Sequence, residues 1–144
     1  MRAPIDRVFA AASDVEHWPE ILAHYRYVRV LARRPDGGLV EMSANRPFGP
    51  LGWPTWWTSE MWVDRDRHLV RYRHVRGVTR GMDVVWQLEP DPAGTRVTIV
   101  HQWDGPAWPL MARPAAEWII GPVFVHGIAT RTLAGIAKAV ERTG

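Results

Sequence analysis

Cysteine is missing from this 144-residue chain. Without a thiol, the protein forms no disulfide, binds no metal through thiolates and has no cysteine nucleophile. Cysteine use therefore gives no sign of an oxidising compartment, and we predict a cytoplasmic protein by default. Lysine is nearly missing as well, since Lys138 is the one lysine among 18 basic residues.

Long hydrophobic runs are also missing. The longest candidate, residues 118–129, is interrupted by Gly121, Pro122, His126 and Gly127, whereas a membrane-crossing helix requires about 20 apolar residues. We therefore predict no transmembrane segment, and no secretory signal pattern precedes the first predicted helix. The length and the 47% hydrophobic content predict one globular domain, residues 1–144, with one core.

Charge of either sign is not concentrated anywhere. The formal net charge is only +3, and the arginines are spread from Arg2 to Arg142. Because no basic helix or aromatic RNA-binding motif accompanies this charge, we predict no nucleic-acid partner. The chain also contains no paired metal-ligand motif, nucleophile elbow or phosphate-binding glycine loop, so we predict no metal and no cofactor.

Residue periodicity predicts an α+β fold. Helical spacing follows Pro4 as far as Ser13, and Ser13 to Glu16 matches a capping box that would start a second short helix through Leu22. A period of two then predicts six antiparallel strands at residues 27–33, 39–45, 55–64, 68–75, 82–89 and 95–103. A helix at 110–120 and a long amphipathic helix from Gly121 close the chain.

This order of elements predicts a helix-grip architecture, in which a curved antiparallel sheet wraps around the long C-terminal helix. A sheet bent around a helix leaves space between the two, so residues on its concave face can line an internal cavity. Alternation in the tryptophan-rich strand places Trp57, Ser59 and Met61 on one face, which we interpret as the concave one. For Trp57 and Trp86, packing in a solid core is the alternative to lining a cavity.

The segment RPFGPLGWP, residues 46–54, is predicted to be a loop because it is rich in glycine and proline. Trp53 in this loop would then belong to a lid over a ligand, or alternatively to a membrane-interface anchor. We favour the lid, because no basic cluster surrounds the segment.

Several stretches together resemble the polyketide cyclase/aromatase branch of the START-like (SRPBCC) superfamily. They are APIDRVF (3–9), SDVEHWPE (13–20), Tyr25, WWTS (56–59), Trp86 and TRTLAGI (130–136). The resemblance covers nearly the whole chain and implies the helix-grip fold. It also implies a hydrophobic small-molecule ligand, such as a polyketide, a lipid or a quinone.

The chain departs from the family pattern at two positions. Family members usually begin with a strand that pairs with the last strand, but only Met1 and Arg2 precede Ala3 here. We therefore expect either a truncated start or an exposed sheet edge. Aromatase/cyclases also commonly carry an inward arginine where this chain has Met61, and methionine cannot hold a developing enolate.

The candidate catalytic residues are His101, Tyr25 and Ser59. A histidine buried among apolar neighbours should be neutral and able to transfer a proton near pH 7, and some similar aromatase/cyclases carry a histidine at the position of His101. A histidine satisfied within the core is the alternative. Tyr25 and Ser59 would orient carbonyl oxygens, or else satisfy themselves locally. The candidate substrate-binding residues are Trp18, Trp57, Met61, Tyr72, His74, Trp86, Trp103 and Leu133.

The resemblance implies two functions. In one, the protein binds a polyketide-type chain and promotes aldol cyclisation and dehydration, and an acyl carrier protein delivers the substrate. In the other, it is a non-catalytic carrier of a lipid or quinone. A homodimer and a partner-binding regulatory domain remain open alternatives.

Overall fold

The computed structural model describes residues 1–48, 51–103 and 125–142, with side chains described except at 46–48, 51–53, 125 and 126. Six antiparallel strands form one sheet in the order β1-β2-β3-β4-β5-β6. Their bounds are β1 Tyr25–Arg34, β2 Gly37–Phe48, β3 Leu51–Asp64, β4 Leu69–Gly77, β5 Asp83–Asp91 and β6 Gly94–Gln102. The predicted meander is confirmed.

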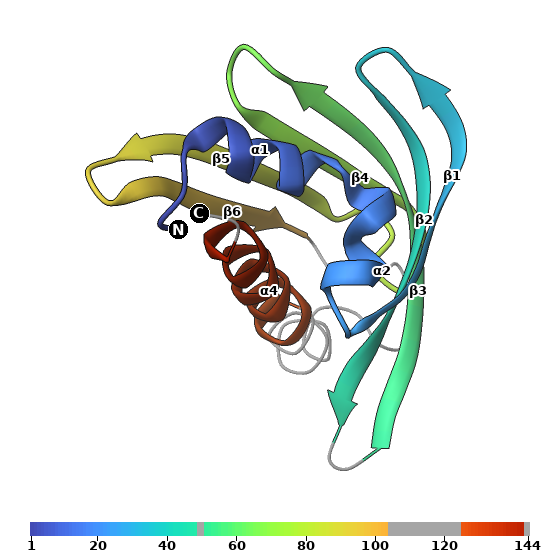
Figure 1. Cartoon of the computed structure of the whole chain (residues 1–144). Helices are drawn as coiled ribbons and strands as arrows, with labels where there is room; N and C mark the ends of the chain where they lie inside the picture. The colour runs from blue at the N-terminus through green and yellow to red at the C-terminus, as the bar shows by residue number, and fades with distance from the viewer. Residues whose placement is uncertain (49–50, 104–124, 143–144) are drawn as a thin grey trace.

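Helices lie on the concave side of this sheet (Figure 1). Near the N-terminus they are α1 Ile5–Ser13, the 3-10 turn η1 Val15–His17 and α2 Trp18–Ile21. Near the C-terminus a π-helical segment, η3 Val125–Ala129, leads directly into α4 Thr130–Glu141. The curved sheet with α4 in its concavity is the helix-grip architecture predicted above (Figure 1). The predicted helix at 110–120 lies outside the described residues.

The apolar stripe of α4 faces the sheet. Ile136 and Val140 are buried, and Leu133 is half-buried against the same core. Gly135 allows α4 to approach α2, because a Cβ placed there would lie 2.3 Å from Leu22 Cδ2. No helix in the described ranges is both long and apolar enough to cross a bilayer.

The predicted capping box does not form. Ser13 is the last residue of α1, and its hydroxyl donates back to the Phe9 carbonyl at 2.8 Å. Asp14 separates α1 from η1, and no side chain caps η1. The motif was misleading because a serine at the end of one helix can satisfy that helix instead of starting the next.

The predicted loop at residues 46–54 is also wrong, because β2 and β3 continue through it. Arg46 pairs with Trp53 and Asn45 pairs with Pro54. β1 pairs with β2 only as far as Ala44, so this part of the hairpin is a two-stranded arm that projects from the sheet (Figure 1). The Asn45 N–H donates to the His24 carbonyl at 2.8 Å instead of to Pro54. Proline is tolerated because this pair requires no hydrogen bond from it.

The first residue of the chain pairs with the edge strand β6. The Met1 ammonium donates to the Thr95 carbonyl at 2.8 Å, and the Thr95 N–H donates to the Met1 carbonyl at 2.8 Å. Thr95 Oγ1 also donates to the Ala3 carbonyl at 2.8 Å. For this edge we expected either a truncated start or exposure, and at Thr95 the edge is covered by residues 1–3.

Candidate functional site

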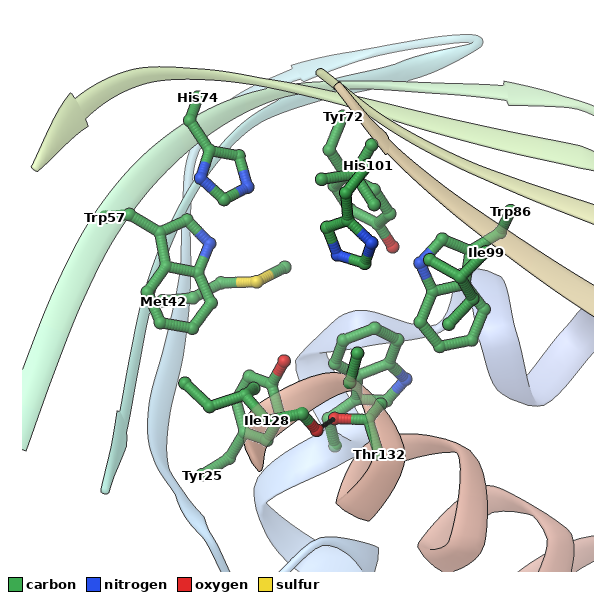
Figure 2. Close-up of a pocket in the computed structure, with 13 residues that line it drawn as sticks. Tyr25, Met42, Trp57, Tyr72, His74, Trp86, Ile99, His101, Ile128 and Thr132 are labelled. Carbon is green, nitrogen blue, oxygen red and sulfur yellow. Dashed lines mark hydrogen bonds between the residues drawn. The ribbon is translucent and has the colours of Figure 1, made fainter. Parts of the chain in front are cut away.

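A cavity lies between the concave face of the sheet and the start of α4 (Figure 2). Its volume is about 50 Å³, which exceeds the minimum of about 10–15 Å³ that one water molecule requires. The described residues that line it are Trp18, Tyr25, Met42, Trp57, Tyr72, His74, Val84, Trp86, Ile99, His101, Ile128, Ala129 and Thr132. The internal space that the fold predicted is present, and its wall is largely aromatic.

Five rings follow one another around this space. Trp86 lies 5.6 Å from Trp18, measured between ring centroids, and Trp18 lies 5.3 Å from Tyr25. Tyr25 contacts Trp57 at 6.2 Å, and Trp57 stacks on His74 at 5.8 Å. The Trp18 ring is fixed from behind because its Nε1–H donates to the Ala11 carbonyl at 3.0 Å. The wall therefore presents flat apolar surfaces that suit a planar ligand.

On the sheet side, the wall consists of side chains that alternate along the strands with solvent-facing ones. Along β4, Tyr72 and His74 are buried while Arg71 and Arg73 are exposed, and both arginines contact Asp83, at 3.3 and 3.1 Å. Alternate residues of β4 thus face the cavity and the solvent. The pairing of β3 with β4 shifts by one residue between Thr58 and Ser59, so that Ser59 is opposite His74 and Trp57 is opposite Gly77.

Gly77 is needed where β4 passes Trp57. Its φ is +95°, which favours glycine, and a Cβ there would lie 2.4 Å from the Trp56 carbonyl oxygen. The backbone of Trp57 can therefore approach β4 closely, with its ring beside His74. The bulge and this glycine together place the stacked pair in the wall.

His74 and His101 are histidines on the upper wall in Figure 2. Burial lowers the pKa of His74 to about 3, with a smaller contribution from His101 nearby. Burial also lowers the pKa of His101. His74 Nδ1 lies 2.5 Å from Oγ1 of Thr79, a fully buried residue in the β4–β5 turn. Both imidazoles are therefore neutral near pH 7.

A second polar group joins β1 to the start of α4. Thr132 Oγ1 donates to the Ile128 carbonyl at 2.8 Å and lies 3.0 Å from His24 Nε2. Thr132 also lies within reach of the Tyr25 hydroxyl and partly offsets the effect of burial on the pKa of Tyr25. Burial raises the pKa of Tyr25, so the phenol stays protonated.

Tyr72 differs from Tyr25. It is 4% exposed and lines the cavity, but its hydroxyl has no hydrogen-bond partner among the described residues. Ser59 also has a buried hydroxyl without a partner there, but Ser59 does not line the cavity. Tyr72 therefore presents the unsatisfied hydroxyl of the cavity wall.

Seven of the eleven predicted site residues come together at the cavity: Trp18, Tyr25, Trp57, Tyr72, His74, Trp86 and His101. The other four are elsewhere among the described residues. Ser59 and Met61 are buried in the sheet face outside the cavity lining. Leu133 borders a shallow groove beside β6. The Trp103 indole donates to the Arg80 carbonyl at 3.1 Å and holds the end of β6 to the β4–β5 turn.

Sequence reasoning did not identify Met42, Ile128, Ala129 or Thr132 as wall residues. Met42 had a detectable signal, because it alternates with Val40 and Ala44 on one face of β2 and all three are buried. Ile128, Ala129 and Thr132 had no such signal in the sequence, because their place in the wall depends on where η3 meets α4. Among the described residues, no group of His, Asp and Glu is placed to hold a metal ion.

Comparison with known protein families identifies the family of this chain. Residues 1–123 match the family described as polyketide cyclase / dehydrase and lipid transport, and the chain belongs to this family. A Streptomyces cyaneus protein whose provisional name is polyketide cyclase is 33% identical over 96 residues, which are 66% of this chain and 62% of that protein. The match thus spans less than two thirds of the length of this relative.

Solved structures share the fold. The Zhui aromatase/cyclase from Streptomyces sp. R1128 superposes with a TM-score of 0.83 at 21% identity, covering 98% of this chain and 88% of that one. A START superfamily protein from Mycobacterium smegmatis superposes with a TM-score of 0.68 at 12% identity, covering 100% and 94%. These likenesses show that the chain shares its fold with both proteins.

Proposed function

We propose that the protein binds a hydrophobic polyketide-type chain in this cavity and promotes its aldol cyclisation and dehydration. The observation that carries the proposal is a neutral histidine, His101, in a wall made largely of aromatic and aliphatic side chains. A neutral imidazole can accept a proton and return it within the same site. The family and the aromatase/cyclase neighbour support a role of this kind.

The steps balance without a cofactor. His101 removes a proton from a methylene group that lies between two carbonyls, and the resulting enolate carbon forms a bond to a distant carbonyl carbon of the same chain. The new alkoxide takes a proton, and a second removal of a carbon-bound proton expels the hydroxyl as water. One carbon–carbon bond forms and one water leaves.

Positioning supplies much of the rate enhancement in this proposal. Flat rings such as Trp57 and Trp86 hold the chain folded, and holding reacting groups in place is worth about 7–11 kcal/mol. The enclosed space of about 50 Å³ is smaller than such a chain. Binding therefore includes movement of wall side chains, and the ligand takes the place of water. An acyl carrier protein, which is acidic, would deliver the chain to the arginine-rich exterior.

The test uses a short poly-β-ketone thioester, with mass spectrometry to detect a product lighter by one water. We expect His101→Asn to slow product formation at least 100-fold while substrate affinity stays within about threefold. His17→Asn, which changes an exposed histidine, is the matched control and should match the wild type. Equal rates for H101N and wild type would refute the role of His101. Binding by the wild type without any product would favour the lipid or quinone carrier.

A further inference from the structure

The Tyr72 hydroxyl is an unusual group for a protein interior. It is buried, it faces the cavity and it has no partner in the described part of the chain. Burying a hydroxyl without a hydrogen bond is unfavourable, so native proteins rarely retain such a group without a use for it. A ligand atom that accepts a hydrogen bond would remove this cost.

Two other polar groups of the wall have a polar neighbour. Tyr25 lies within reach of Thr132, and His74 Nδ1 is 2.5 Å from Thr79 Oγ1. Tyr72 is held as a phenol because burial, and secondarily the nearby Tyr25, raise its pKa well above the usual value. The phenol can therefore donate a hydrogen bond to a ligand while it keeps its proton.

The described wall carries no full charge. None of its residues is Arg, Lys, Asp or Glu, and burial lowers the pKa of both histidines. The arginines of β4 face solvent on the opposite side of the strand. A carboxylate or phosphate placed in this wall would lose its hydration without gaining a counter-ion, which is strongly unfavourable.

We propose that the Tyr72 hydroxyl donates a hydrogen bond to a carbonyl oxygen of a neutral, planar ligand, and that the cavity discriminates against carboxylate analogues of the same size. The proposal rests on the proposed ligand-binding function of the cavity and adds the polarity of the ligand. It assigns to Tyr72 the carbonyl-orienting role that the sequence predicted for Ser59.

Three naphthalenes of similar size provide the test: 2-acetylnaphthalene, 2-ethylnaphthalene and 2-naphthoate. Affinities are measured by calorimetry at pH 7.5 on wild type, Tyr72→Phe and the control Tyr27→Phe, which changes a tyrosine outside the cavity lining. We expect wild type and Y27F to bind the ketone at least tenfold more tightly than either other probe. In Y72F the preference for the ketone over the ethyl compound should fall to less than twofold.

The carbonyl stretch of bound 2-acetylnaphthalene gives a second readout. It should shift to lower frequency in wild type and Y27F, and this shift should be lost in Y72F. An unchanged ketone preference in Y72F, equal affinity for 2-naphthoate, or failure of all three probes to bind the wild type would overturn the proposal. A ketone preference that depends on Tyr72, in a protein that forms no cyclised product, would uphold it while refuting the cyclase function.

Discussion

Trp57 and His74 stack face to face, with ring centroids 5.8 Å apart and planes 12° from parallel. The two residues are on neighbouring strands, and the bulge between β3 and β4 sets their relative position. His74 is 5% exposed. A protonated imidazole would lose most of its hydration there, so the fold keeps this histidine neutral.

Unfolding stability should therefore decrease as the pH falls. The pKa of His74 is lower in the folded state, about 3 against 6.5, so below pH 6.5 the unfolded chain binds the extra proton first. This contribution is fully present above pH 6.5 and is lost between pH 6.5 and 3. By pH 5 the loss of unfolding free energy amounts to about 2 kcal/mol. Urea unfolding at pH 8 and pH 5 measures the loss.

The variant His74→Asn provides the comparison. Between pH 8 and pH 5 its free energy of unfolding should fall by about 2 kcal/mol less than that of the wild type, whatever its absolute stability. Some pH dependence should remain, because burial lowers the pKa of His101 in the same direction. Identical losses for the two proteins would show that His74 is not held neutral by the fold.

Thr79→Val should destabilise the protein by about 1–3 kcal/mol, because it leaves the Nδ1 atom of His74 without its partner in a buried place. Thr79→Ser keeps the hydroxyl and should retain most of that stability. The ¹⁵N shifts of the His74 ring report its tautomer, and they should change in T79V but not in T79S. An unaltered ring spectrum in T79V would mean that Thr79 does not fix the tautomer.

Trp86→Ala should cost about 3–5 kcal/mol, because it removes a buried ring that packs against Trp18. Trp56→Ala on the same sheet should cost no more than about 1 kcal/mol, since Trp56 is 47% exposed. Thermal unfolding separates these values. A similar loss for both variants would contradict the assignment of the two faces.

Gly77→Ala and Gly81→Ala form a matched pair. Both glycines have positive φ, +95° and +90°, but a Cβ at Gly81 meets no atom within 4 Å, whereas one at Gly77 would overlap the Trp56 carbonyl. We expect about 1–2 kcal/mol of destabilisation at Gly81 from backbone conformation alone, and a larger loss at Gly77. Chemical denaturation measures both, and equal losses would argue against a close approach of Trp57 to β4.

The strands and the closing helix could be predicted because their periods follow from burial on one face. Residues Tyr72 and His74 alternate with Arg71 and Arg73 in the sequence, and burial on one face makes this pattern visible. The arm through Pro54 was not predictable in this way. Local composition indicates a loop there, and only the pairing of Asn45 with His24 shows why proline is tolerated.

The cavity was predictable from the fold, but its polar chemistry was only partly so. The inward direction of Tyr25 and Tyr72 follows from their strands. The surroundings of the Tyr25 hydroxyl depend on Thr132, which is more than a hundred residues from Tyr25 in the chain and approaches it only through the packing of α4. Ser59 has the right alternation but lies outside the cavity lining. The strand period predicts which face of the sheet a residue is on, but not whether that residue reaches the cavity.

The part of the wall at the start of α4 presents Ile128, Ala129 and Thr132, whereas most of the rings come from the sheet. Ala129 carries the smallest side chain of the lining and comes just before the first turn of α4. A bulkier residue at this single position would shorten the space without touching an aromatic contact. The depth of the site can thus be changed by evolution or by design from the helix, while the tryptophans continue to set its width.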